Sequence, residues 1–116
     1  MINLSDMRRY FLYRGNTDMR KSFDGLCGLV RDKLQREPLS GEVFVFISKR
    51  RNQIRLLLWE GDGFSLYSKR LEKGTFEIPE ATAHCIELNN EQLLFILKGI
   101  KLQSVEKRKR FSFPRV

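Results

Sequence analysis

The residues with the clearest chemistry in this sequence are cations gathered in short runs. Lys49, Arg50 and Arg51 are consecutive, and the amides of Asn52 and Gln53 follow them. Three adjacent cations concentrate a positive potential that attracts phosphate, and a two-stranded ribbon carrying them can enter a major groove or lie along a phosphate backbone. The run predicts a contact with nucleic acid, and the alternative is an exposed loop that is polar for solubility alone.

Two further groups of cations have the same chemistry. One lies near the N-terminus and comprises Arg8, Arg9, Arg14, Arg20 and Lys21. The other lies in the C-terminal tail, where Phe111 and Phe113 follow the cations Lys107, Arg108, Lys109 and Arg110. A basic arm can fold onto phosphates while its aromatic rings stack on exposed bases. The alternative for the tail is a solvated terminus with no ligand.

The net charge of +8 is concentrated at the two ends of the chain. Residues 1–21 hold five Lys or Arg and two acids, and residues 101–116 hold six Lys or Arg and one acid. Residues 22–100 hold eleven of each, so the body of the chain is neutral. A basic end segment is a common way to grip a polyanion, because each neutralised phosphate releases condensed counterions. General basicity without a ligand is the alternative.

The acids, the histidine and the cysteines do not form a recognisable reactive pattern. A two-metal nuclease needs several carboxylates that converge on one cavity, and the candidates are Asp18, Asp24, Asp32, Glu60 and Asp62. Turn chemistry explains Glu60 and Asp62, and the start of a helix explains Asp24. His84 is the only histidine and no Cys-x-x-Cys pair exists, since Cys27 and Cys85 are far apart. We expect no catalytic residue, no metal ion and no cofactor.

Short strands and two helices must position the cations. Residues 10–13 form an apolar run that predicts a strand. Phe23, Leu26, Cys27, Val30 and Leu34 fall on one face of a helix that begins at a cap, Ser22 or Asp18, and stops before Pro38. A second helix is predicted from Asn89 or Asn90, with Leu93, Leu94, Leu97 and Ile100 as its apolar stripe and Gly99 near its end.

Between the helices, tight turns join four predicted strands. Residues 43–47 are apolar on both faces and therefore predict a central strand. Residues 54–59 return from the cationic loop, residues 64–69 follow the glycine-flanked turn at 60–63, and residues 75–78 complete the set before Pro79. Trp59, Phe64 and Tyr67 are more consistent with core packing than with an exposed patch for a protein partner.

These elements predict an α+β fold. An antiparallel sheet of four to five strands, arranged as a meander, packs against one amphipathic helix, and a C-terminal helix and a basic tail follow. The strand at residues 9–14 is expected to join the sheet. We expect one domain over residues 1–100 and a flexible basic tail over residues 101–116. No apolar run approaches the roughly 18 residues of a membrane helix, and the N-terminus lacks a secretory signal, so a cytoplasmic protein is expected.

Two separated blocks of sequence resemble one family. The first block, residues 17–26, reads TDMRKSFDGL. The second block, residues 58–74, comprises LWEGDGF at 58–64 and LYSKRLEKG at 66–74, and Pro79 follows soon after. This arrangement resembles the TnpB-type accessory protein encoded by the second open reading frame of insertion sequence 66 transposons. The resemblance covers roughly residues 10–80 and does not extend convincingly beyond about residue 100.

The resemblance implies a non-catalytic protein needed for transposition, while a separate, larger transposase carries the acidic catalytic residues. We therefore expect an accessory factor that binds DNA electrostatically, with transposon ends, the transposase and other transposon-encoded proteins as partners, and neither a membrane nor a small-molecule substrate. The candidate DNA contacts are Lys49, Arg50, Arg51, Asn52, Arg20, Lys21, Lys69, Arg70, Lys107, Arg108, Lys109 and Arg110. The alternative is a scaffold for the transposase with little or no direct DNA contact.

Overall fold

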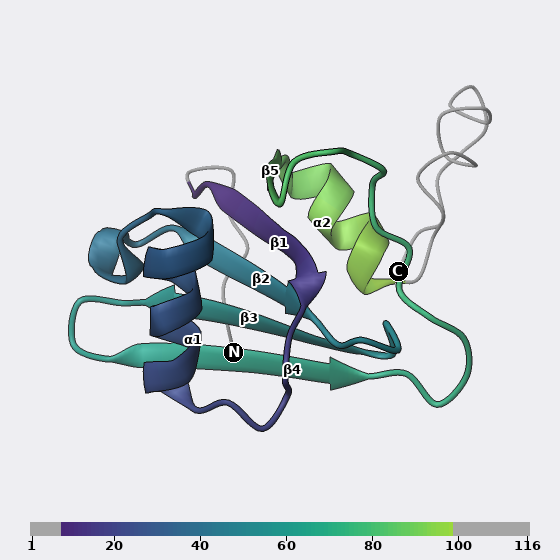
Figure 1. Ribbon diagram of the computed structural model, residues 1–116, viewed down its shortest axis with the longest axis horizontal. Helices are drawn as coiled ribbons and strands as arrows, with labels where there is room; N and C mark the ends of the chain where they lie inside the picture. Colours follow the sequence, from purple (N-terminus) through teal and green to yellow (C-terminus); the bar gives the residue numbers. More distant parts are fainter. Residues whose placement is uncertain (1–7, 99–116) are drawn as a thin grey trace.

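Strands that are apolar on both faces lead to a layered fold, with a sheet between two helices (Figure 1). The computed structural model describes residues 8–98, so the expected tail, Gly99 and Ile100 lie outside the described residues. Five strands form one sheet in the order β4-β3-β2-β1-β5. Their bounds are β1 Tyr10–Asn16, β2 Val43–Ile47, β3 Gln53–Trp59, β4 Phe64–Arg70 and β5 Cys85–Leu88. The α+β class is confirmed, and β2 is central, as its two apolar faces predicted.

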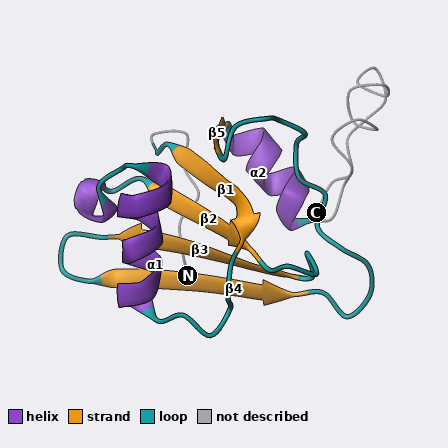
Figure 2. Cartoon of the chain, in the orientation of Figure 1, coloured by secondary structure: helices purple, strands orange, loops and turns teal. Residues whose placement is uncertain are grey.

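The helices cover opposite faces of this sheet (Figure 2). Helix α1, Phe23–Leu29, follows Ser22 as N-cap and continues as a π-helical turn over Val30–Leu34, and a short 3-10 turn over Pro38–Ser40 precedes β2. Helix α2, Asn90–Leu97, is capped by Asn89, whose side chain accepts from the Gln92 amide while the Gln92 side chain accepts from the Asn89 amide. This capping box satisfies two amides that no helical carbonyl can reach.

Alternate residues of each strand contribute to two separate hydrophobic clusters. On one face, Leu12, Val45 and Leu56 pack with Leu93 and Ile96 of α2. On the other face, Phe11, Phe44, Phe46 and Leu57 of the sheet pack with Leu26 and Cys27 of α1 and with Val30 of the π-helical turn. Side chains of consecutive strand residues lie on opposite faces of the sheet. A sheet that is apolar on both faces therefore needs a helix on each face. No helix within residues 8–98 has the length and apolar character to span a membrane.

The strand arrangement differs from a pure antiparallel meander in one pair. Strands β2, β3 and β4 do form the expected meander. The β2–β3 pairing is antiparallel and includes Val43↔Leu58, and the β3–β4 pairing is antiparallel and includes Gln53↔Arg70. Strand β1 joins the sheet as expected, but it pairs with β2 in parallel, from Tyr10↔Val43 to Tyr13↔Phe46. The connection from β1 to β2 contains α1, and a helical crossover returns the chain in the same direction as it left.

The predicted strand at residues 75–78 is wrong. This segment has no strand partner, although Phe76 is only 1% exposed and belongs to the core. The fifth strand is instead β5, which pairs with β1 in the antiparallel sense from Tyr10↔Leu88 to Tyr13↔Cys85. Residues 71–84 therefore form a connection that leaves the end of β4 and returns to the opposite edge of the sheet.

Candidate nucleic-acid interface

The turn between β2 and β3 presents the three consecutive cations at one end of the sheet. Lys49, Arg50 and Arg51 are all exposed, and none of their side chains forms an ion pair or hydrogen bond with any residue from 8 to 98. The Arg51 amide donates to the Ser48 carbonyl over 2.9 Å, which closes a tight turn. Arg51 has a φ of 59°, in the left-handed region that residues other than glycine rarely occupy. The positive charge of this turn is therefore available to a ligand.

A second segment fixes the turn to the core. The Leu71 amide donates to the Asn52 carbonyl over 2.8 Å, and the Phe76 amide donates to the Arg51 carbonyl over 2.7 Å. Within the turn, the Asn52 side chain accepts from the Ser48 hydroxyl, and that hydroxyl accepts from the Gln53 amide. Asn52 is thus half-buried and engaged inside the turn, while the cations point outward from a braced backbone.

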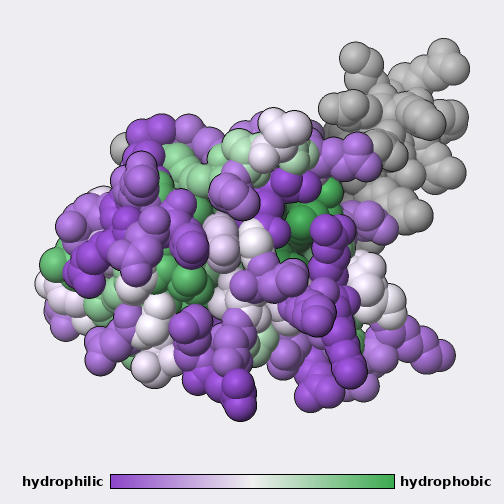
Figure 3. Space-filling model, viewed as in Figure 1, coloured by the Kyte–Doolittle hydropathy of each residue, from purple (hydrophilic) through white to green (hydrophobic). Residues whose placement is uncertain are grey.

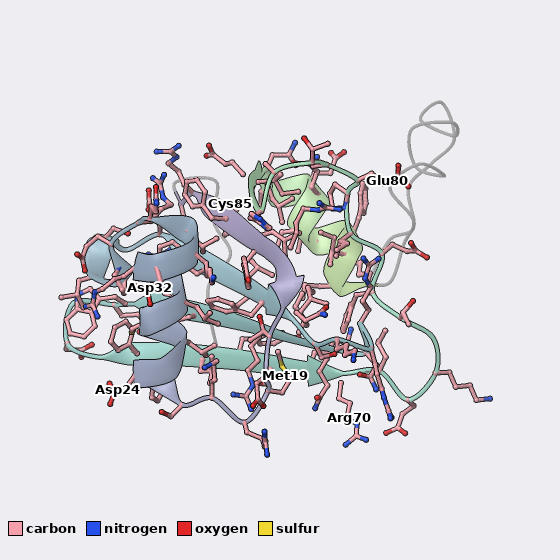
Figure 4. The ribbon with its side chains drawn as sticks, viewed as in Figure 1. Met19, Asp24, Asp32, Arg70, Glu80 and Cys85 are labelled. Atoms are coloured by element: carbon pink, nitrogen blue, oxygen red, sulfur yellow. The ribbon has the colours of Figure 1, made fainter. Side chains whose placement is uncertain are left out.

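The two cations at the end of β4 face opposite sides of the sheet. Arg70 pairs with Gln53 in the β3–β4 ladder, is exposed, and lies beside the turn. Figure 4 shows its side chain pointing away from the sheet at this end of β4. Lys69 points to the other face, where its ammonium donates to the Leu97 carbonyl of α2 over 2.6 Å. Lys69 therefore satisfies a carbonyl at the C-terminus of a helix, as a cation commonly does.

We call Lys49, Arg50, Arg51 and Arg70 the cationic tip. The loop from residue 17 to residue 21 runs past this tip, because the Thr17 amide donates to the Ile47 carbonyl over 3.1 Å. The half-buried Arg55 of β3 holds the far end of the loop, since its guanidinium donates to the Lys21 carbonyl over 2.9 Å. The fold thus places Arg20 and Lys21 on a loop that starts next to the cationic tip.

Arg20 has an acidic partner. Its guanidinium forms a forked contact with Asp18, with separations of 2.9 to 3.3 Å, and both groups are exposed. The hydrogen bonds from Arg20 lower the pKa of Asp18 to about 2. At neutral pH the carboxylate is therefore charged and offsets the charge of Arg20. Lys21 forms no ion pair within residues 8–98, although its charge also interacts with Asp18.

The other N-terminal cations stabilise the fold. Arg8 donates to the Gly41 carbonyl over 2.9 Å, and Arg14 donates to the Ala81 carbonyl in the connection before β5. Arg9 makes a forked ion pair with Glu87 at 2.8 Å, which raises the pKa of the guanidinium and lowers that of the carboxyl. These three residues connect β1 to its surroundings and do not extend the cationic tip.

Sequence reasoning missed Arg55. The signal was a single cation inside the apolar run of residues 54–59. Lys107 to Arg110, the remaining candidates, lie outside the described residues.

The acids and thiols are dispersed within the described part of the chain. Between residues 8 and 98 there is no group of three His, Cys, Asp or Glu residues arranged to hold a metal ion. Both cysteines are free, and burial raises the pKa of the Cys27 and Cys85 thiols, so neither is activated as a nucleophile. The arrangement that this surface offers is electrostatic: cations on a rigid turn, suited to phosphate groups.

Comparisons with known proteins agree with the resemblance of the two sequence blocks. Residues 8–107 match the family model described as IS66 Orf2 like protein. The uncharacterized protein y4hO of Sinorhizobium fredii is 35% identical over 92 residues, which cover 79% of this chain and 80% of the relative. The uncharacterized protein y4jC of the same organism is 30% identical over 108 residues, or 93% of this chain and 92% of the relative. No solved structure matches the chain.

Proposed function

This chain belongs to the family of IS66 Orf2-like proteins, and we propose that it is a non-catalytic accessory protein of insertion-sequence transposition that binds duplex DNA through the phosphate backbone. Membership of this family supports the role in an insertion sequence. The proposed contact with DNA rests on the cationic tip, and the transposase supplies the catalytic residues.

The observation that carries the proposal is the unpaired state of the tip cations on a braced turn. Four cations, Lys49, Arg50, Arg51 and Arg70, are exposed and have no acidic partner within residues 8–98. The backbone below three of them is held by the amides of Leu71 and Phe76. A backbone that is already ordered loses little conformational entropy on binding, so the turn retains more of the electrostatic gain than a disordered loop would.

The chemistry favours contacts with phosphates over the reading of bases. The Asn52 amide, which could have contacted a base edge, accepts from Ser48 inside the turn. Arginine and lysine contacts to phosphate fix the position of a protein on DNA and carry no sequence information of their own. We therefore propose binding with little sequence preference at the tip. The basic tail, residues 101–116, acts as a second arm, and Lys21 extends the contact along the loop.

The affinity for DNA should fall steeply with salt. If the four cations of the tip each neutralise one phosphate, the logarithm of the affinity falls with the logarithm of the salt concentration at a slope of roughly −3.6, and the tail makes it steeper. Fluorescence anisotropy of a labelled transposon-end duplex across a salt series measures this slope. A flat salt response, or no binding at low salt, contradicts the proposal.

A matched pair of variants tests the location of the contact. Lys49→Ser with Arg50→Ser removes one lysine and one arginine from the tip, while Arg31→Ser with Lys33→Ser removes the same pair from the exposed turn after α1. Residues 30–34 precede β2, and the tip follows β2, so the two pairs lie toward opposite ends of that strand. The tip variant should weaken binding and lower the salt slope by about 2, while the control changes the slope little.

Scaffolding of the transposase is the competing function. Co-purification with the transposase after nuclease treatment measures a contact between the two proteins that does not run through DNA. A complex that survives nuclease, together with no binding of duplex by the isolated protein, favours scaffolding over the proposed function.

A further inference from the structure

Three aromatic rings form a partly exposed stack at the end of the sheet away from the cationic tip. The Phe23 ring of α1 stacks on the Phe64 ring of β4, with centroids 5.9 Å apart and planes at 21°. Trp59 of β3 makes an edge contact with this pair, and its ring centroid lies 4.9 Å from that of Phe64. Phe23 is 40% exposed, and among residues 8–98 only Leu39 is a more exposed large hydrophobic residue. We call Phe23, Trp59 and Phe64 the aromatic end.

This stack joins the two sequence blocks, since Phe23 belongs to the first block and Trp59 and Phe64 belong to the second. The proposed contact with DNA does not use any of the three rings. On the face drawn in Figure 3, hydrophobic side chains reach the surface at the end of the molecule that carries the β3–β4 turn. The three rings are in contact with one another, and contiguous apolar side chains that reach the surface are a feature of interaction sites.

Carboxylates surround the aromatic end. Asp24 follows Phe23 at the start of α1, and Glu60 and Asp62 lie in the turn that joins Trp59 to Phe64. All three acids are exposed, and neither Asp24 nor Asp62 has a cationic partner in the described part of the chain. Figure 4 shows Asp24 at the Phe64 end of β4 and Arg70 at the opposite end. Rings bordered by negative charge fit a segment that carries both cations and hydrophobic anchors.

The chain contains one segment with that chemistry. Lys107, Arg108, Lys109 and Arg110 are followed by two anchors of the right kind, Phe111 and Phe113. We propose that residues 107–113 dock on the aromatic end of the same chain, with their phenylalanines on the rings and their cations beside the carboxylates. The contact within the protein does not depend on DNA binding, whereas its release by DNA rests on the proposed function.

The tail is long enough to reach this surface. Helix α2 ends at Leu97, whose carbonyl contacts Lys69 near the far end of β4 from Phe64. Lys69 lies five positions after Phe64 along the strand, or about 17 Å at the rise of an extended chain, and the passage around the edge of the sheet adds about 10 Å. Phe111 lies thirteen positions after Lys98, and a chain of that length spans up to about 43 Å. Because the tail is covalently attached, its effective concentration at the aromatic end is high.

Docking would give the tail two competing ligands. Held against Asp24, Glu60 and Asp62, the tail cations are withdrawn from phosphates, and a DNA duplex with its higher charge density would release them. The aromatic end would then be exposed only when the tail is engaged elsewhere. A contact of this kind lets the protein report the presence of DNA by uncovering a hydrophobic surface.

Trp59 provides the experiment, because it is the only tryptophan in the chain. We would compare the emission maximum and acrylamide quenching of the full chain with those of a Phe111→Ser, Phe113→Ser variant. The proposal expects the variant to show a red-shifted emission and stronger quenching, since the rings that cover Trp59 are gone. Ser112→Ala, which changes the tail between the two phenylalanines, is the matched control and should behave as the wild type. Equal quenching in the wild type and the double variant would overturn the proposal.

Two further measurements test the docking site and whether the docked tail belongs to the same chain or to a second copy. Asp62→Asn keeps a residue suited to a turn but removes a carboxylate, so it should increase quenching of Trp59 toward that of the tail variant. Dilution of the wild type should leave quenching unchanged, whereas a loss of protection on dilution would assign the contact to a second copy and overturn the same-chain proposal. None of these measurements contains DNA, so they can be interpreted even if the proposed function fails.

Discussion

The amide of Phe76 donates to the carbonyl of Arg51 over 2.7 Å, and this bond joins a core residue to the turn that carries the cations. The Phe76 side chain is 1% exposed and packs in the cluster that α2 covers, while the Arg51 side chain projects into solvent. The position of the cationic tip is therefore coupled to the packing of the hydrophobic core.

Truncation of Phe76 should destabilise the whole domain. Phe76→Ala leaves a cavity among buried side chains and should lower the free energy of unfolding by about 3 to 5 kcal/mol, a large part of the stability of a small domain. Phe76→Leu retains most of the volume and should cost less. Urea denaturation followed by circular dichroism measures both values. A loss below about 1 kcal/mol for the alanine variant would show that the segment is not anchored by this side chain.

Substitution of Arg51 should separate charge from backbone strain. Both Arg51→Gly and Arg51→Ala remove one cation, so both should weaken DNA binding equally and reduce the salt slope by about 1. Only glycine accepts the φ of 59° without a steric cost. The glycine variant should therefore be more stable than the alanine variant by up to about 1 kcal/mol. Thermal unfolding and anisotropy on the same samples test the two effects, and unequal DNA affinities would contradict the electrostatic account.

Neighbouring cations on β4 should give opposite results. Lys69→Met removes the donor to the Leu97 carbonyl and should lower stability by about 1 kcal/mol with little effect on DNA binding. Arg70→Met should leave stability within about 0.5 kcal/mol of the wild type and weaken DNA binding, because Arg70 is exposed beside the tip. Since the two variants lose the same charge, each is the control for the other. Equal effects on DNA affinity would contradict the assignment of Arg70 to the tip.

The Asp18–Arg20 pair should make stability depend on pH in the acid range. The pKa of Asp18 is about 2 in the folded protein against an ordinary value of 3.8. A carboxyl whose pKa is lowered by folding contributes stability above its ordinary pKa and loses that contribution as the pH falls toward the folded value. Asp18→Asn should therefore unfold at a lower temperature than the wild type at pH 6, and the difference should vanish near pH 2. A difference that stays constant over this range would contradict the pairing.

The local elements of this fold are readable from sequence because their signals are local. Apolar periodicity predicts α1 and the meander of β2, β3 and β4. Asn89 and Asn90 are both predicted as possible caps of the second helix, because an amide side chain before an apolar stripe satisfies unpaired helical amides, and the structure has Asn89 as the cap. The cationic turn between β2 and β3 was located for the same reason. It lies between two strands that the pattern defines well.

The errors concern contacts between distant parts of the chain. Residues 75–78 alternate as a strand would, but the Phe76 amide donates to the turn at Arg51, which no local pattern indicates. The parallel pairing of β1 with β2 follows from the helix between them, and β5 is only four residues long. Among the candidate site residues, Lys69 and Arg70 are adjacent in sequence and alike in charge. Their side chains point to opposite faces of the sheet, so Lys69 contacts helix α2 while Arg70 is exposed to solvent.

The place of β1 between β2 and β5 has a consequence for the order in which the protein is made. Strand β1 leaves the ribosome before the other four strands, yet its outer neighbour β5 follows about seventy residues later, at Cys85–Leu88. Until that point an apolar strand has an open edge, and such an edge can pair with other nascent chains. The sheet can close only when synthesis of the described domain is nearly finished, so the newly made chain depends on late, long-range pairing for its solubility.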